Sequence, residues 1–142
     1  MRTTLVLLAL CVFLTTAQAQ RIKVDVQISS ENAGIEAEVR SYISRELRSL
    51  GDVDIADDSV YSLYIVVTEP TLSTDPATHR GYVLSYSFIE IVTCSGEEIG
   101  KFLQGSMITG GRDSIPTLAK RIVLNFDTKV LEARRAKYRR AK

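Results

Sequence analysis

Hydrophobic and polar residues follow two different periods along the first half of the chain. Between Ile22 and Ile28 apolar residues alternate strictly with polar ones, which predicts a half-buried strand. Between Ile35 and Leu50 apolar residues recur at helical spacing, which predicts an amphipathic helix. Polar residues at 29–32 provide its amino-terminal cap, and Gly51 ends it.

Further strands follow this helix. Residues 53–55 predict a short strand, and the apolar run 60–68 predicts a strand that is covered on both faces or has one wet face lined by tyrosine. Residues 82–108 alternate around a turn at Ser95-Gly96 and predict a long antiparallel hairpin, which we place at the centre of the sheet. The apolar phase shifts at Phe88-Ile89, which indicates a bulge or burial on both faces.

A second amphipathic helix begins at Ile115. Ser114 is its expected cap, Pro116 fits its first turn, and its apolar stripe continues to Val130. Two such helices cannot bury their stripes on each other and still cover a sheet. The order of elements therefore predicts an α+β fold: a two-layer sandwich with a mainly antiparallel sheet of four to five strands and both helices on one face.

The first twenty residues resemble a leader segment. A positive start at Arg2, an apolar run from Leu5 to Leu14 and small residues at Ala17 and Ala19 predict a secretory signal peptide, cleaved after Ala19. The apolar run is shorter than the about 20 residues of a membrane-spanning helix. We therefore expect an exported protein, periplasmic or secreted. Its expected parts are a signal peptide at 1–19, a single α+β domain at 20–131 and a basic carboxyl-terminal helix end or tail at 132–142.

Composition and charge change this picture in two places. Hydrophobic residues make up 45% and charged residues 25% of the chain, which is typical of a globular protein. Cleavage removes Cys11 and leaves Cys94 alone, so no intramolecular disulfide is expected. Residues 132–142 hold six basic residues and one acidic residue. Removal of Arg2 with the signal peptide leaves the mature chain with no net charge. The part of it that precedes residue 132 is therefore acidic.

Three features together are similar to small envelope domains of bacteria. They are the helix Ile35–Leu50 ending in Leu-Gly, the strand Val53-Asp54-Ile55, and the strand Leu84–Gly96 closing in a Ser-Gly-Glu turn. This order resembles the amino-terminal domain of TolB and the curli-secretion lipoproteins. The resemblance implies a docking or assembly module without catalytic activity. Leu10 precedes Cys11 where lipoproteins require a small residue, which argues against a lipid anchor.

Catalytic and metal-binding patterns are weak. His79 is the only histidine and lies in the polar loop 70–81, so a dyad with Cys94 requires this loop to fold over the hairpin turn. One histidine and one mature cysteine exclude the usual zinc sets. Residues 52–63 resemble a calcium loop but lack its glycine and its final glutamate. The glycine-rich segment 105–112 lacks the spacing and the lysine of a P-loop. No cofactor is expected.

Two groups of residues are candidates for contacts. The basic end is a candidate for an anionic surface, although the same cations suit a helix carboxyl terminus or balance the acidic body. Its members are Arg134, Arg135, Lys137, Arg139, Arg140 and Lys142. Strand tyrosines are candidates for contact with a partner, although tyrosines in strands are more often buried. They are Tyr64, Tyr82 and Tyr86.

These observations favour an exported, non-catalytic binding or assembly module of the bacterial cell envelope. Its expected partner is another envelope protein or a second copy of the chain, and nucleic acid fits poorly with export. One alternative is a small periplasmic enzyme that uses His79, Cys94 or a carboxylate. Another is a peripheral protein that the basic end holds at an anionic membrane surface.

Overall fold

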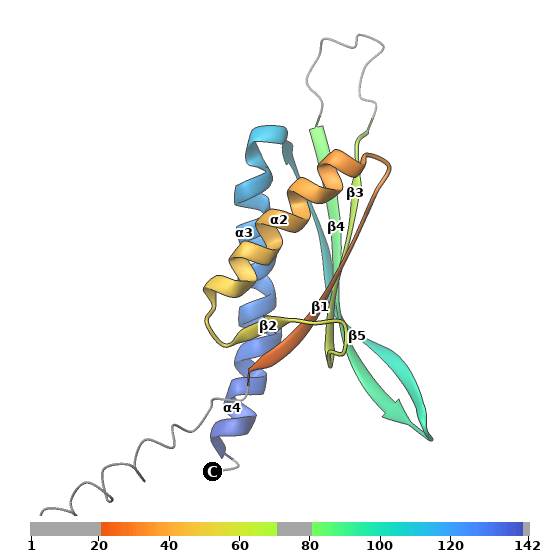
Figure 1. Ribbon diagram of the computed structural model, residues 1–142, viewed down its shortest axis with the longest axis vertical. Helices are drawn as coiled ribbons and strands as arrows, with labels where there is room; N and C mark the ends of the chain where they lie inside the picture. Colours follow the sequence, from red (N-terminus) through yellow and green to blue (C-terminus); the bar gives the residue numbers. More distant parts are fainter. Residues whose placement is uncertain (1–20, 71–80, 141–142) are drawn as a thin grey trace, which may run out of the picture.

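The computed structural model describes residues 21–70 and 81–140. One five-stranded sheet in the order β2-β1-β3-β4-β5 carries a layer of helices on one face (Figure 1). The strands are β1 (Ile22–Ser30), β2 (Val53–Ile55), β3 (Tyr61–Thr68), β4 (Gly81–Cys94) and β5 (Glu97–Gly111). The helical elements are α2 (Ala33–Ser49), η1 (Arg112–Ser114), α3 (Ile115–Phe126), η2 (Asp127–Leu131) and α4 (Glu132–Arg140). The predicted two-layer α+β sandwich is confirmed.

The position predicted for the long hairpin is wrong. Strand β1 pairs in parallel with both β2 and β3, whereas β3, β4 and β5 pair antiparallel. The chain leaves β1 through α2 and adds β2 at one edge, and β3 then pairs with the other side of β1. Strand β3 therefore occupies the middle of the sheet and β5 forms the opposite edge. No residue of β5 is buried, which agrees with its place at the edge.

Helix α2 begins and ends where its sequence predicts. The Asn32 Oδ1 atom accepts hydrogen bonds from the backbone N–H groups of Gly34 and Ile35, at 3.0 and 3.3 Å. Gly51 takes a φ of +79°, which an L side chain rarely adopts, and so turns the chain toward β2. The four apolar residues that face the sheet are all buried: Ile35, Val39, Ile43 and Leu47.

Helix α3 has its predicted apolar stripe but not its predicted cap. Ser114 lies in η1 with helical φ and ψ of −88° and −12°, and its side chain forms no capping hydrogen bond. A capping side chain needs an extended backbone, which η1 does not allow at this position. Helix α3 continues through the π-helical η2 into α4, and Val130 and Leu131 extend the buried stripe. None of the described helices is long and apolar enough to span a membrane.

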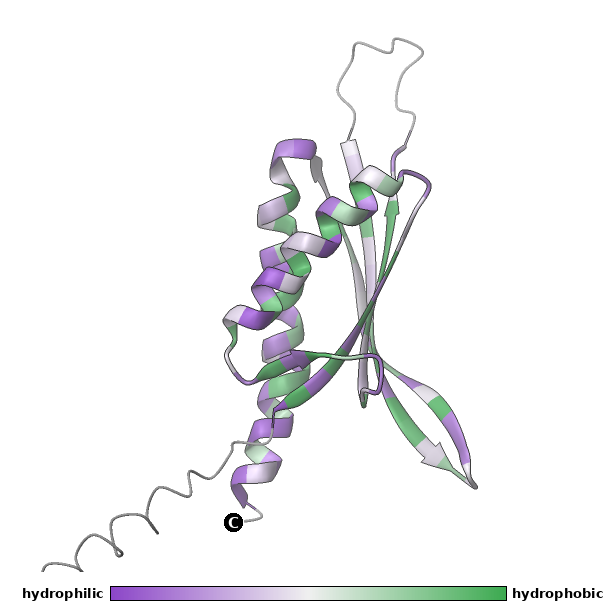
Figure 2. Ribbon diagram, in the orientation of Figure 1, coloured by the Kyte–Doolittle hydropathy of each residue, from purple (hydrophilic) through white to green (hydrophobic). Residues whose placement is uncertain are grey.

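An aromatic cluster fills the core between the sheet and α3. The ring centroids of Phe88 and Phe126 lie 5.0 Å apart, and Tyr61 meets Phe126 edge-on at 6.5 Å. Tyr86 packs on Phe88 and accepts a hydrogen bond from Asn125 at 2.7 Å. Hydrophobic and hydrophilic residues alternate along the strands and helices (Figure 2), and β1, β4, α2 and α3 each bury one face.

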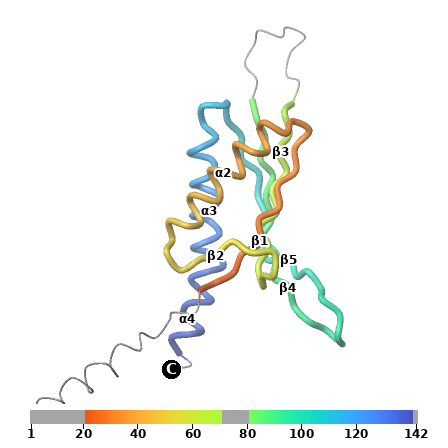
Figure 3. Tube along the Cα trace, in the orientation of Figure 1, coloured from red at the N-terminus to blue at the C-terminus, as the bar shows by residue number. Residues whose placement is uncertain are grey.

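The β4–β5 hairpin carries the predicted irregularity. The register shifts between Phe88 and Ile89, because Phe88 pairs with Gln104 and Ile89 pairs with Phe102, which leaves Leu103 as the extra residue. Beyond this bulge the hairpin extends away from the helices (Figure 3). We name residues 89–102 the arm. The turn at its tip has positive φ at Ser95 and Gly96, as the Ser-Gly sequence predicts.

Candidate functional site

The described helices all lie on one side of the sheet, and we name the side chains of β3, β4 and β5 on the other side the outer face. Alternation and strand register assign its members. They are Ser62, Tyr64, Val66, Thr68, Val83, Ser85, Ser87, Ile89, Ile91, Thr93, Glu98, Gly100, Phe102, Gly105, Met107 and Thr109. All of them except Glu98, which lies near the tip of the arm, are uncharged. Depletion of charge is typical of the core of a protein–protein interface and unusual for a solvated sheet face.

Large apolar side chains stand exposed on the outer face. Phe102 and Met107 are 65% and 64% exposed, and Tyr64 and Val66 are 38% and 36% exposed. Strand register places Val66 and Met107 on either side of Ser85, in one row across three strands. The exposed groups therefore form a neighbouring set on one surface, which is a mark of an interaction site.

Phe102 owes its position to Gly105. A Cβ atom added at Gly105 would lie 2.9 Å from the backbone oxygen of Tyr86 and 3.2 Å from two ring carbons of Phe102. The Phe102 ring thus lies against the strand where Gly105 provides no side chain. This packing orients the ring but leaves most of its surface open to solvent.

Strand β5 also offers a free edge. It pairs with β4 on one side and ends the sheet on the other. From Phe102 to Gly111 it carries no charged residue, although long edge strands usually carry charges that prevent pairing with another chain. An unprotected edge beside an apolar face suits the addition of a strand from a partner.

The structure separates the three candidate tyrosines. Tyr64 lies on the outer face, where it is available to a partner. Tyr82 and Tyr86 point the other way and are 5% and 4% exposed, so their prediction as partner contacts needs correction. They share the phase of Leu84 and Phe88, and α3 and its neighbours cover that side of β4. A partner role for Tyr64 stays a prediction.

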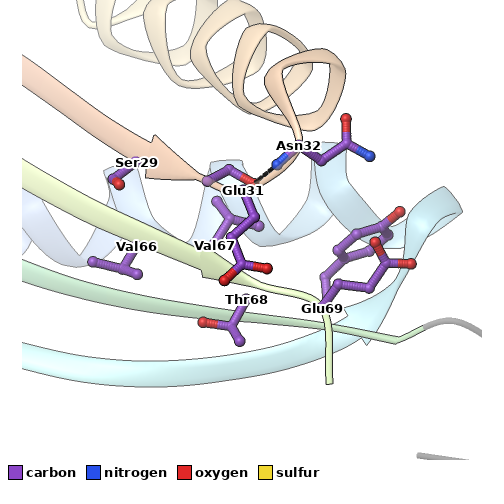
Figure 4. Close-up of a pocket in the computed structure, with 9 residues that line it drawn as sticks. Ser29, Glu31, Asn32, Val66, Val67, Thr68 and Glu69 are labelled. Atoms are coloured by element: carbon purple, nitrogen blue, oxygen red, sulfur yellow. Dashed lines mark hydrogen bonds between the residues drawn. The ribbon is translucent and has the colours of Figure 1, made fainter. Parts of the chain in front are cut away.

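A shallow pocket lies where β1 and β3 end, and Figure 4 shows its lining. Its volume is about 270 Å³. It presents the hydroxyls of Ser29 and Thr68 and the carboxylates of Glu31 and Glu69. The backbone N–H of Asn32 donates to Ser30 Oγ at 3.2 Å and so fixes the rim. Its described lining residues are polar and apolar side chains with two carboxylates, and none of them is a histidine or a cysteine.

The basic end divides into paired and unpaired cations. Arg135 is 27% exposed and donates to both carboxylate oxygens of Asp52, at 2.6 and 2.8 Å, and to Asp127 at 2.6 Å. The hydrogen bonds from Arg135 lower the pKa of Asp52, and those to Asp52 and Asp127 raise the pKa of Arg135. Arg135 therefore fastens α4 to the body and is not free for a surface contact, which corrects that part of the prediction.

The other basic residues differ from Arg135. Arg134 stacks over the Tyr138 ring, with its guanidinium carbon 4.5 Å from the ring centroid. Within the described part of α4, the remaining cations are exposed or half-buried without an acidic partner. They are Arg134, Lys137, Arg139 and Arg140. Lys142 lies outside the described residues. A contact of these side chains with an anionic surface stays a prediction.

The acids of the calcium-like segment face cations of the protein itself. Asp54 pairs with Arg21 at 2.6 Å, and Asp58 pairs with Lys23, whose hydrogen bond lowers the Asp58 pKa. Among residues 21–70 and 81–140, no group of three or more histidine, cysteine or acidic side chains is arranged to hold a metal. Cys94 is exposed at the end of the arm, and His79 lies outside the described residues.

Comparison with known proteins shows likeness of structure. No family model matches the sequence, and neither does any curated protein. A Xanthomonas campestris protein described by the family model DUF330 is 11% identical, with a TM-score of 0.56 over 85% of this chain and 93% of that one. The PelC dodecamer from Paraburkholderia phytofirmans is 20% identical, with a TM-score of 0.47 over 78% and 89% of the two chains. A minor lipoprotein from Acinetobacter baumannii is 16% identical, with a TM-score of 0.46 over 75% and 92%.

The likeness to the DUF330 protein shows a shared fold and nothing further. The match covers 93% of the DUF330 protein, so the two chains share the α+β sandwich over most of their lengths. Proteins that are called lipoproteins are among the structural neighbours. The resemblance to the TolB amino-terminal domain and to the curli-secretion lipoproteins stays a prediction.

Proposed function

We propose that this protein is an exported, non-catalytic binding module of the bacterial cell envelope, which docks a partner protein on the outer face of its sheet. The observation that carries the proposal is the outer face, which has no charged residue outside the tip of the arm and on which Phe102 and Met107 are about two-thirds exposed. Export is supported by the signal-peptide pattern of residues 1–19. The edge of β5 gives the partner a backbone to pair with, beside the apolar surface.

The partner that fits this surface is a protein with an extended segment. Hydrogen bonds from a partner strand to the β5 backbone provide affinity, and alternate side chains of that strand meet the outer face. A stable interface of this kind buries about 800 Å² on each partner. Strand β5 from Phe102 to Gly111 lies beside the uncharged outer-face residues of β3 and β4, and together they offer a surface for it.

A photo-crosslinking residue at position 107 tests the docking surface in intact cells. Leu124 provides the matched control, because it is 59% exposed and apolar but lies on α3 in the helix layer. We expect a discrete crosslinked product from position 107 and none from position 124. Mass spectrometry of the product then distinguishes another envelope protein from a second copy of this chain.

A substitution pair completes the test. Met107→Glu places a charge in the outer face, and Leu124→Glu places the same charge in the helix layer. We expect Met107→Glu alone to dissociate the complex on a native gel of detergent-solubilised envelope. Equal crosslinking at both positions, or a complex that survives Met107→Glu, contradicts the proposal. Loss of a defined catalytic activity in a His79→Ala, Cys94→Ser double variant would instead support the enzyme alternative.

A further inference from the structure

A second pocket lies at the other end of the sheet, where β1 and β3 begin and α4 passes beside them. Its volume is about 230 Å³, and we name it the basic pocket. Three cationic side chains line it, Arg21, Lys23 and Arg134, and they come from the start of β1 and from α4. The rings of Tyr61 and Tyr138 line it too. This site is separate from the outer face and is independent of the proposed docking function.

Asp58 also lines the basic pocket and Asp54 lies beside it, but these two carboxylates do not neutralise all three cations. Arg21 pairs with Asp54, and Lys23 pairs with Asp58. In both pairs the side chains are about half or more exposed, and such exposed pairs are weak and exchange readily with other anions. Arg134 forms no ion pair with any described residue. The pocket therefore keeps an uncompensated positive charge.

Arg134 is already oriented for a ligand. Its guanidinium stacks on the Tyr138 ring, and its NH2 atom donates to Tyr138 Oη at 2.5 Å. A guanidinium has five N–H donors, so this contact leaves most of them available. Stacking on the ring already restricts the Arg134 side chain. Arg134 therefore loses less conformational entropy when it binds an anion.

The Tyr61 hydroxyl provides a second donor. Tyr61 is 5% exposed, and no residue in the described part of the chain forms a hydrogen bond with its Oη atom. No fully buried side-chain oxygen among the described residues lacks a partner, so solvent must reach Tyr61 Oη. The opening that Tyr61 lines is the basic pocket. Burial raises the pKa of Tyr61, which keeps the phenol protonated as a donor at neutral pH.

We propose that the basic pocket binds a phosphate ester, whose phosphate accepts hydrogen bonds from Arg134, Lys23 and the Tyr61 hydroxyl. Three donors that come from different elements suit a tetrahedral anion with three free oxygens better than a planar carboxylate. The apolar side chains of Ile22 and Val60 and the tyrosine rings leave room for the organic part of the ester. Lys137, Arg139 and Arg140 on the same helix add a field that attracts anions.

Titration with glycerol 3-phosphate by isothermal calorimetry tests the pocket, with the purified wild-type protein as reference. Arg134→Gln removes a charged donor and is expected to weaken binding by about 10- to 100-fold. Tyr61→Phe keeps the packing of the ring and removes only the hydroxyl, and about three- to tenfold weaker binding is expected. Arg121→Gln is the matched control, because Arg121 is an exposed arginine of α3 outside the pocket, and it should bind as the wild type does.

A second arm distinguishes the sources of the phosphate. Vesicles that contain phosphatidylglycerol present the same ester as a lipid headgroup, and vesicles of phosphatidylcholine alone are the control. Vesicle binding that falls in both Arg134→Gln and Tyr61→Phe assigns the pocket to a lipid headgroup. If instead both substitutions weaken the binding of glycerol 3-phosphate in solution, the pocket is assigned to a soluble ester. Three results overturn the proposal. Arg121→Gln weakens binding as much as Arg134→Gln does, Tyr61→Phe leaves binding unchanged, or neither glycerol 3-phosphate nor the vesicles bind.

Discussion

Arg135 is expected to be the residue that holds α4 on the body of the domain. Its guanidinium forms three hydrogen bonds of 2.6 to 2.8 Å to Asp52 and Asp127, and the three side chains are 20% to 31% exposed. A hydrogen bond to a charged group contributes about 1.5–3 kcal/mol when buried, and exposed ion pairs contribute about 0.2–1 kcal/mol. Each of these partly buried hydrogen bonds lies between the two limits, at roughly 1 kcal/mol. Because Arg135→Gln removes or weakens all three, it should lower the free energy of unfolding by about 2–3 kcal/mol.

Urea denaturation followed by circular dichroism measures this loss, since an unchanged m-value shows that stability alone has changed. The expected fall in Tm is roughly 8–12 °C for a domain of this size. Arg139→Gln is the control, because Arg139 is an exposed cation of the same helix. A double-mutant cycle with Asp52→Asn should return a coupling energy of about 1–2 kcal/mol. Equal stability of the two arginine variants, or a coupling energy near zero, would refute the reasoning.

Three further outcomes follow from the core and from the same ion pair. Hydrogen bonds from Arg135 lower the pKa of Asp52 in the folded protein below its ordinary value of 3.8. The Asp52 carboxylate therefore contributes its full stability above pH 3.8, and this contribution is lost as the pH falls through the lowered pKa of the folded state. Urea midpoints measured between pH 2 and 5 should thus fall less steeply in Asp52→Asn. Phe126→Ala empties a fully buried site between sheet and helix and should cost about 3–5 kcal/mol in urea denaturation. Gly105→Ala places a methyl group 2.9 Å from the Tyr86 backbone oxygen and should cost about 1–3 kcal/mol. Gly111→Ala, which meets nothing within 4 Å, should change the melting temperature little.

Local periodicity predicted the elements well where one period holds over many residues. Strand β1 and helix α2 agree with their predicted residues within about two positions, because strict alternation and a capped helical stripe leave little choice. Ser114 shows where such reasoning stops. A serine before a helix favours a cap, but the short η1 turn that precedes α3 has no counterpart in the hydrophobic pattern.

Sheet order required information that lies far apart in the sequence. The hairpin is the longest apolar feature, so its length suggested the centre of the sheet. The parallel pairing of β1 with β3 decides the order instead, and this pairing joins residues separated by the whole of α2 and β2. One local signal did favour an edge for β5: Gly100, Lys101, Gln104 and Gly105 make it much less apolar than the run that became β3.

The burial of two candidate tyrosines could be predicted from local alternation, whereas the pairing of Arg135 could not. Alternation alone places Tyr82 and Tyr86 in phase with Leu84 and Phe88, so the sequence already contained the reason for their burial. The basic end was different, because Arg135 and Asp52 are 83 residues apart in sequence. Nothing near either residue marks the pair, and only the packed α4 brings the two side chains together.

The two proposed sites arise from the topology in different ways, which makes them separable by experiment. The outer face depends on the alternation within neighbouring antiparallel strands, far from α4. The basic pocket exists because parallel pairing starts β1 and β3 at the same end of the sheet, where the helix that continues α3 adds Arg134. A charge at Met107 should therefore leave phosphate binding intact, and loss of Arg134 should leave the docking surface intact, since sites without shared partners act independently.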